Sequence, residues 1–243
     1  ALAASVGLGT LCTYRPLRVG VLSTGSELTE PGNPARPDQI YDANRPMLLS
    51  LAMAWGFLPV DLGRVEDNRA AVRGALDNAA ANVDVILTSG GASAGDEDHM
   101  SAVLKEAGQL ATWRIAVKPG RPLAMGLWQG CPVFGLPGNP VAAFVCALIF
   151  ARPALNCLAG GAWAEPVGHL LPARFGKKKK PGRVEYLRAR RSDDGGVEVF
   201  HSEGSGRVSG LSWADGLVEL PHDQGAVAPG DAVRYLPFSA LGL

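Results

Sequence analysis

A glycine-rich segment that ends in three carboxylates has the clearest chemical potential in the sequence. It reads Thr88-Ser-Gly-Gly-Ala-Ser-Ala-Gly-Asp-Glu-Asp98 and directly follows an apolar run. A glycine loop between a strand and a helix can direct backbone N–H groups at a phosphate, and this loop contains Ser89, Gly90, Gly91, Ser93 and Gly95. Asp96 stands where a P-loop has lysine, and Asp96 and Asp98 would repel a phosphate unless a divalent cation lay between them. The segment favours a phosphate site with a divalent cation; the alternative is an acidic helix start that interacts only with the helix dipole.

Two further turns could bind anions. Lys118-Pro-Gly-Arg-Pro122 holds two cations close together, because proline stiffens the backbone and glycine permits close approach. An ordinary β-turn with solvated charges is an equal alternative for this segment. The second turn delivers Pro137, Gly138 and Asn139 to the start of an apolar helix, where free N–H groups could hold an oxyanion. Taken alone, this second pattern favours a plain helix cap.

Two weaker segments supply carboxylate, hydroxyl and amide groups. They are Ser23-Thr-Gly-Ser-Glu-Leu28 and Ile40-Tyr-Asp-Ala-Asn-Arg45, with candidate binding residues Thr24, Gly25, Glu27, Asp42 and Asn44. Neither is specific by itself. Together with the turns above, they predict polar loops gathered on one edge of a single sheet.

The elements that must position these loops alternate between strands and helices. We expect strands at 18–24, 57–62, 83–88, 113–117, 123–127 and 133–135, and helices at 42–55, 67–79, 99–107 and 140–158, the last interrupted at Pro153. Continuously apolar strands that alternate with helices indicate an α/β fold with three layers, in which a mostly parallel sheet is covered on both faces. In such sheets the ligand crevice lies at the carboxyl ends of the strands, where these loops follow.

The pattern changes after Gly160-Gly161. Short apolar runs separated by glycine, proline and aspartate then predict a small all-β domain. The expected organisation is a lead-in at 1–14, an α/β domain at 15–162 and a β-domain at 163–243. We expect Lys177–Lys180 to form a solvated loop. The first residue is not Met, so we expect the chain to be part of a longer protein.

Composition excludes several classes of protein. The 243 residues contain 23 Lys and Arg and 23 Asp and Glu, and this zero net charge argues against a nucleic-acid partner. Hydrophobic residues make up 47%, which excludes a disordered chain. The four cysteines form no CxxC pattern and indicate reduced thiols in a cytoplasmic protein. The longest apolar run, Val141–Phe150, is about half the length of a membrane span, so no membrane association is expected.

The motifs, taken in their order along the chain, resemble those of the MoeA family, the molybdopterin molybdenumtransferases. The motifs are Ser-Thr-Gly-Ser-Glu-Leu, Tyr-Asp-Ala-Asn-Arg, the Gly-Gly loop to Asp98, Lys-Pro-Gly-Arg-Pro and Leu-Pro-Gly-Asn-Pro, and the resemblance spans roughly residues 17–240. It implies a molybdopterin-binding α/β domain, a C-terminal β-domain and a homodimer. It also implies a reaction in which adenylylated molybdopterin is cleaved with the help of Mg²⁺ or another divalent cation, and molybdenum from molybdate is left on the dithiolene. The upstream molybdopterin adenylyltransferase is an implied partner.

The resemblance also implies residue roles. Asp98 would be essential to catalysis and would hold the cation together with Asp96, while the loop residues given above would bind substrate. Molybdate would be bound by Lys118, Arg121, Pro122, Arg183 and Ser205. Arg188 belongs to the same Arg-Val-Glu-Tyr-Leu-Arg segment as Arg183.

The sequence departs from the family in three respects. Ser26 and Ala142 replace residues that are often Asp and Ser in relatives, and the family's two N-terminal regions are missing. A molybdopterin adenylyltransferase is the alternative enzyme, although it usually lacks the β-domain. A non-catalytic scaffold of the gephyrin kind is the alternative from another class.

Overall fold

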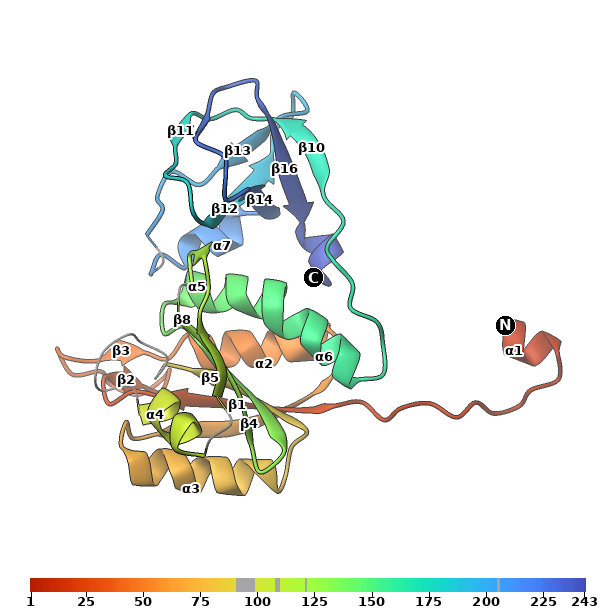
Figure 1. Ribbon diagram of the computed structural model, residues 1–243, viewed down its shortest axis with the longest axis vertical. Coiled ribbons are helices and arrows are strands. Elements are labelled where there is room, and N and C mark those ends of the chain that lie inside the picture. The colour runs from red at the N-terminus through yellow and green to blue at the C-terminus, as the bar shows by residue number, and fades with distance from the viewer. Residues whose placement is uncertain (91–98, 108–109, 121, 205) are drawn as a thin grey trace.

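The computed structural model describes residues 1–90, 99–107, 110–120, 122–204 and 206–243. Its body contains a six-stranded sheet flanked by helices and, beyond one layer of helices, a second sheet formed mainly by the C-terminal part of the chain (Figure 1). The first residues of the chain, which include the short helix α1 (Leu2–Ser5), extend away from this body as an arm, and Arg15 at its base pairs with Asp84 at 2.5 Å. The expected combination of an α/β fold with a smaller β-rich part is confirmed.

The first sheet has the strand order β4-β1-β5-β9-β8-β6. Its four parallel strands are β4 (Leu58–Val65), β1 (Arg18–Thr24), β5 (Val85–Ser89) and β9 (Cys131–Leu136). Antiparallel β8 (Pro122–Trp128) and β6 (Leu110–Arg114) complete one edge. The sheet is therefore mostly parallel, as the alternation of strands and helices predicted.

Helices cover both faces of this sheet because its strands are apolar on both sides. Val85 and Leu87 pack with α2 (Asn44–Ala54) and with the long helix of residues 140–158, whereas Ile86 packs with α3 (Arg69–Ala80) and α4 (His99–Glu106). Asn68 caps α3, since its side chain accepts a hydrogen bond from Ala71 N at 2.9 Å. This three-layer arrangement is visible in Figure 1.

The long apolar helix consists of α5 (Pro140–Cys146), the π-helical turn η1 (Ala147–Ala151) and α6 (Arg152–Leu158). The expected interruption at Pro153 takes the form of this π turn, and Pro153 lies in the first turn of α6, where a missing N–H is best tolerated. By length and hydropathy the helix could cross a membrane, but 61% of its apolar window is buried inside the structure. This burial is typical of a core helix.

The second sheet is antiparallel along the order β10-β16-β14-β12-β13. Its strands are β10 (His169–Pro172), β16 (Ala232–Pro237), β14 (Gly216–Leu220), β12 (Val184–Arg191) and β13 (Val197–Val199). A two-stranded ribbon of β11 (Lys177–Lys178) and β15 (Ala226–Val227) lies beside it, and the short helices α7 (Ser209–Trp213) and η2 (Phe238–Leu241) follow β13 and β16. Leu217, Leu236 and Leu241 join the same apolar core as the long helix, so the two sheets share a buried interface.

Between β6 and β8, both in the first sheet, the chain passes through the second sheet. The sequence predicted a single strand at 113–117, which is wrong: β6 ends at Arg114, and β7 (Val117–Lys118) pairs in parallel with β12 of the second sheet. Residues 115 and 116 redirect the chain, and the carbonyl of Ala116 accepts a hydrogen bond from Val184 N at 2.9 Å. Lys118 is thereby placed opposite Glu185.

Candidate functional site

A cavity of about 970 Å³ lies between the carboxyl ends of the first sheet and the second sheet. It is lined by turns from both parts of the chain, which the shared core holds in place. Eleven of the residues expected to bind substrate or oxyanion line it, namely Thr24, Gly25, Glu27, Asn44, Ser89, Gly90, Lys118, Pro137, Gly138, Asn139 and Arg183. The expectation of polar loops gathered at one sheet edge is therefore met for the described residues.

Three turns meet at the floor of the cavity. Gly90 follows β5 with φ +86°, and a Cβ atom built there would lie 2.2 Å from the carbonyl oxygen of Thr24. Gly138 approaches the same glycine, because its own added Cβ would lie 3.8 Å from Gly90 Cα. Only a residue without a side chain allows the turn after β1 and the turn after β5 to approach so closely.

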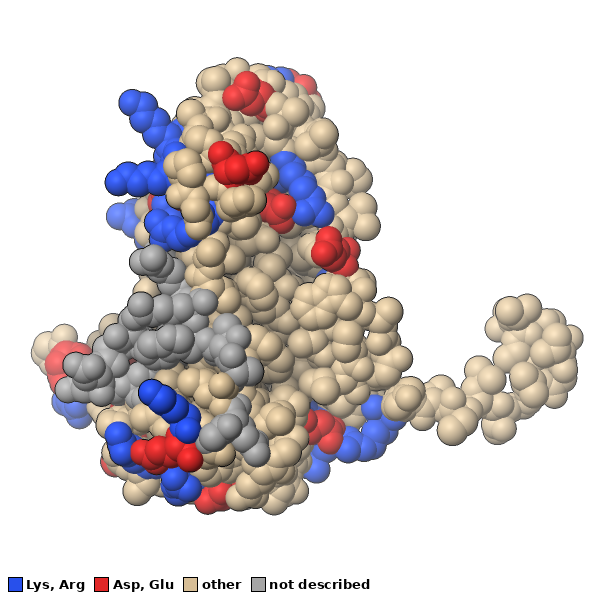
Figure 2. Space-filling model, viewed as in Figure 1, with Lys and Arg blue, Asp and Glu red and all other residues tan. Residues whose placement is uncertain are grey.

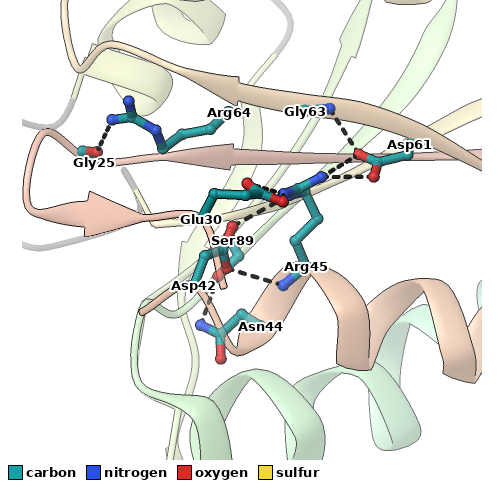
Figure 3. A network of polar contacts seen from close by, with 9 residues as sticks. All are labelled: Gly25, Glu30, Asp42, Asn44, Arg45, Asp61, Gly63, Arg64 and Ser89. Carbon is teal, nitrogen blue, oxygen red and sulfur yellow. Dashed lines mark hydrogen bonds and ion pairs between the residues drawn. The ribbon is translucent and has the colours of Figure 1, made fainter. Parts of the chain in front are cut away.

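Asn44, at the start of α2, fixes two of these turns, and Figure 3 shows its contact with Ser89. Its amide nitrogen donates hydrogen bonds to Ser89 Oγ and to the carbonyl oxygen of Gly138, each at 2.7 Å. Its Oδ1 atom is buried and accepts no hydrogen bond within the described residues, and the same is true of Thr24 Oγ1. Buried acceptors are normally satisfied, so a donor-bearing ligand in this cavity would find two free acceptors.

The Lys118 turn closes another wall. The Lys118–Pro119 peptide bond is cis, and Gly120 has φ +109°. A Cβ at Gly120 would lie 2.4 Å from Sγ of Cys146 in α5, so the turn packs tightly on the long helix. Burial raises the pKa of that thiol to about 12, which keeps it protonated and unreactive near neutral pH.

Lys118 reaches two carboxylates of the C-terminal part of the chain. Its Nζ lies 2.8 Å from Oε2 of Glu203 and 3.5 Å from Oε2 of Glu185. Burial alone would lower the pKa of Lys118, but the hydrogen bond to Glu203 and the charges of Glu185 and Glu203 raise it overall. The side chain is therefore fully protonated at neutral pH and can bind an anion.

Comparison with known proteins agrees with the sequence motifs. Residues 20–156, more than half of the chain, match the family described as the probable molybdopterin binding domain, and residues 171–238 match the MoeA C-terminal region, domain IV. The chain belongs to the MoeA family.

Individual relatives extend over nearly the whole chain. A molybdopterin molybdenumtransferase of Haemophilus influenzae is 37% identical over 99% of this chain and 61% of its own length. Molybdopterin molybdenumtransferase 2 of Mycobacterium tuberculosis is 34% identical over 96% of this chain and 59% of its own length. The crystal structure of a molybdopterin biosynthesis MoeA protein from Pyrococcus horikoshii superposes with a TM-score of 0.83 at 28% identity, over 98% of this chain and 58% of that one. The chain thus spans about three fifths of the length of these MoeA relatives.

Asp42, which the sequence predicted to bind substrate, is not one of the residues that line the cavity. In this MoeA-family chain its carboxylate is buried and does not line the cavity; it accepts hydrogen bonds from Arg45 N at 3.1 Å and Arg45 Nε at 3.3 Å. Arg45 also pairs with Glu30 and, at 2.6 Å, with Asp61 (Figure 3). Burial opposes the charge of Arg45, but hydrogen bonds to Asp61 and Glu30 raise its pKa overall. Asp42 and Arg45 thereby hold the segment between β1 and α2, which contains β2 (Leu28–Thr29) and β3 (Ile40–Tyr41), beside the cavity.

The two arginines of the Arg-Val-Glu-Tyr-Leu-Arg segment differ in their surroundings. Arg183 lines the cavity and is free of hydrogen-bond and ion-pair partners within the described residues. Arg188 is buried, and its guanidinium donates to the carbonyl oxygens of Arg207 at 2.6 Å, of Gly204 at 3.2 Å and of Ser202. Arg188 therefore fixes the segment after β13, whereas Arg183 is available to an anion.

The Lys177–Lys180 tract is not simply a solvated loop, contrary to expectation. Alternate residues of the tract are buried: Lys177, with a side chain only 8% exposed, lines the cavity, and Lys179 donates to the carbonyl oxygens of His222 and Gln224. Lys178 and Lys180 are exposed, and basic side chains project from this edge of the second sheet in Figure 2. Four identical lysines show no alternation in the sequence, so the alternating burial arises only from the strand geometry of the folded chain.

Gly91, Ser93, Gly95, Asp96, Asp98, Arg121 and Ser205 lie outside the described residues. Pro122 begins β8. Sequence reasoning did not identify Lys177 and Glu203 as cavity residues, although both line it.

Proposed function

We propose that this chain carries out the molybdopterin molybdenumtransferase reaction, in which adenylylated molybdopterin is cleaved, AMP leaves, and molybdenum from molybdate is retained on the dithiolene. The observation that carries the proposal is the single cavity in which the Gly90 and Gly138 turns face Lys118 and Arg183. Such a cavity offers backbone N–H groups and buried acceptors on one side and cations on the other. A substrate that combines phosphates, a pterin ring and an oxyanion needs this combination.

The pterin and phosphate part is proposed to lie over the three turns. Glu27, Ser89, Pro137 and Asn139 line this region together with Thr24, Gly25, Asn44, Gly90 and Gly138, and we assign Gly91, Ser93 and Gly95 to the same site from the sequence. A pterin ring carries N–H donors, which would satisfy the free acceptors Thr24 Oγ1 and Asn44 Oδ1. The glycine turns permit close approach of the backbone to phosphate.

The oxyanion is proposed to bind at Lys118, Arg121, Pro122, Arg183 and Ser205. Lys118 lies on β7 and Arg183 directly precedes β12, the strand that pairs with β7, and both side chains line the same cavity, so an oxyanion there would be bound by two cations. Charged donors make the strongest hydrogen bonds to oxyanions. The hydroxyl of Ser205 would add a neutral donor.

A divalent cation such as Mg²⁺ is proposed to be held by Asp96 and Asp98. The described residues include no group of three His, Cys, Asp or Glu side chains that could hold a metal ion, so the fit is judged from donor chemistry. Carboxylates are the hard oxygen ligands that Mg²⁺ prefers, and both aspartates follow Gly90 closely in the sequence. When bound, the cation would offset the charge of the phosphates at the point of cleavage.

Assembly, location and domain limits form the remaining part of the proposal. We propose a cytoplasmic homodimer that receives its substrate from the molybdopterin adenylyltransferase, with a lead-in at 1–14, an α/β domain at 15–162 and a β-domain at 163–243. The neutral net charge and the buried long helix support a protein without nucleic-acid or membrane partners. Sedimentation of the chain at several concentrations measures the assembly directly.

The activity test follows AMP release and molybdenum incorporation from adenylylated molybdopterin, molybdate and Mg²⁺. We expect molybdate-dependent AMP release, lost in Asp98→Asn and retained in the matched control Asp223→Asn, which changes an exposed aspartate outside the cavity. Arg121→Ala should raise the molybdate concentration needed for half-maximal incorporation. Full turnover by Asp98→Asn would contradict the assignment. Net adenylylation of molybdopterin by ATP would instead identify an adenylyltransferase.

A further inference from the structure

Four charged side chains form a cluster on the wall of the cavity, which we call the lysine–glutamate cluster: Lys118, Lys177, Glu185 and Glu203. Glu203 pairs with Lys118 at 2.8 Å and also with Lys177. Glu185 Oε2 lies 3.5 Å from Lys118 and 3.3 Å from Lys177. With two positive and two negative side chains, the cluster has no net charge to attract an anion.

The two carboxylates of the cluster are held differently. Glu185 lies on β12, opposite Lys118 of β7, and its side chain is only 5% exposed. Its Oε2 atom accepts no hydrogen bond within the described residues, although both lysines are within ion-pair distance. Glu203 lies on the segment between β13 and α7, and its side chain is 51% exposed. Glu203 therefore can turn into solvent without disturbing a strand, and Glu185 cannot.

The backbone beside Glu203 is fixed even though its side chain is exposed. The guanidinium of Arg188 holds the carbonyl oxygens of Ser202 and Gly204, which flank Glu203 on either side. Arg188 also stacks over the Phe200 ring, with Cζ 4.9 Å from the centroid. Rotation of the Glu203 side chain alone therefore releases Lys118 and Lys177. Because the backbone stays in place, the carboxylate can return to the same position.

We propose that Lys177 is a further oxyanion-binding residue and that Glu203 is a resident carboxylate which occupies Lys118 and Lys177 until an oxyanion displaces it. A carboxylate and a tetrahedral oxyanion present similar acceptor oxygens to an ammonium group. Once Glu203 leaves, Lys118, Lys177 and Glu185 together carry a net charge of plus one, and Arg183 adds another positive charge at the same cavity. Glu203 thereby lowers the affinity for oxyanions and keeps weakly bound anions out. The inference rests on the proposed function, because it concerns the same oxyanion site.

The test is equilibrium dialysis of the 243-residue chain against molybdate at neutral pH and fixed, low ionic strength. Glu203→Gln keeps the shape of the side chain and removes its charge, so it should bind molybdate about threefold to tenfold more tightly than the unchanged chain. Added salt should reduce this difference, since the competing pair is partly exposed. Glu198→Gln is the matched control, because Glu198 pairs with Arg190 at 3.4 Å and does not line the cavity. The affinity of this variant for molybdate should stay within about twofold of that of the unchanged chain.

A second pair of variants tests Lys177 independently. Lys177→Gln should weaken molybdate binding about tenfold, whereas Lys178→Gln, which changes the exposed neighbour on β11, should change it less than about twofold. Circular dichroism checks that each variant is folded. If Glu203→Gln binds molybdate no more tightly than the unchanged chain does, the inference is wrong and the proposed function stands. If molybdate binds to neither protein, both the oxyanion site and the inference are overturned.

Discussion

The side-chain nitrogen of Asn44 lies 2.7 Å from the carbonyl oxygen of Gly138, and this contact ties the start of α2 to the turn that precedes α5. The same nitrogen reaches Ser89 Oγ at the end of β5. One amide therefore sets the spacing between two turns that line the cavity.

Replacing Asn44 with aspartate tests this contact. Asn44→Asp removes the donor and places a carboxylate oxygen against the Gly138 carbonyl, so the free energy of unfolding should fall by about 1–3 kcal/mol. Urea unfolding measures the change. Asn33→Asp, at an exposed loop position, should leave stability within about 0.5 kcal/mol. Equal effects of the two substitutions would show that the bridge does not stabilise the fold.

Gly90 should tolerate no side chain. In Gly90→Ala the Cβ would lie 2.2 Å from the Thr24 carbonyl oxygen at a backbone φ of +86°, so stability should fall by about 2 kcal/mol or more. Gly74→Ala is the matched control inside α3, where an added Cβ meets nothing within 4 Å. That substitution should raise stability by about 0.5–1 kcal/mol. A stable Gly90→Ala protein with unchanged ligand binding would contradict the packing of these turns.

The sequence predicted the α/β part well because its signals are local. Apolar runs such as Val85–Ser89, followed at once by glycine, identify a buried strand and its turn without knowledge of the rest of the chain. The Asn68 cap of α3 could be predicted for the same reason. The parallel arrangement of the strands then predicts that these turns lie together at the carboxyl ends of the strands.

Side-chain contacts and strand pairings that depend on the folded chain as a whole could not be predicted. An aspartate at position 42 could bind either a ligand or a neighbouring arginine. Only the folded chain shows that its carboxylate pairs with Arg45. The transfer of β7 to the second sheet depends on pairing with β12, about 67 residues later, which no local pattern encodes. Lys177 reaches the cavity from β11, which pairs with β15 about 50 residues later, and Glu203 reaches it from the segment after β13.

Arg45 is expected to stabilise the fold rather than bind ligand. Arg45→Met would leave the buried Asp42 carboxylate without its cation, so the free energy of unfolding should fall by about 3–5 kcal/mol. Arg36→Met removes an exposed arginine whose Nε lies 3.3 Å from Asp38, and should change stability by less than about 1 kcal/mol. Chemical denaturation compares the two variants. A loss below about 1 kcal/mol for Arg45→Met would refute the structural role.

The lysine–glutamate cluster should make stability depend on pH in the acid range. Hydrogen bonds from Lys118 and Lys177 lower the pKa of Glu203 from its ordinary 4.5 to about 2. A lowered carboxylate pKa stabilises the folded state above pH 4.5, and this contribution is lost as the pH falls toward 2. Unfolding free energies measured across this window should therefore fall less steeply for Glu203→Gln than for the unchanged chain. Parallel curves would show that Glu203 does not pair with the lysines in solution.

The most direct test of the account is a crystal structure of this chain with adenylylated molybdopterin and molybdate. We predict that the pterin phosphates lie over the Gly90 and Gly138 turns, that the oxyanion lies within hydrogen-bond distance of Lys118 Nζ, and that the Glu203 carboxylate is turned away from both lysines. A ligand bound with full occupancy outside the cavity, or an oxyanion that makes no contact with Lys118, would contradict it.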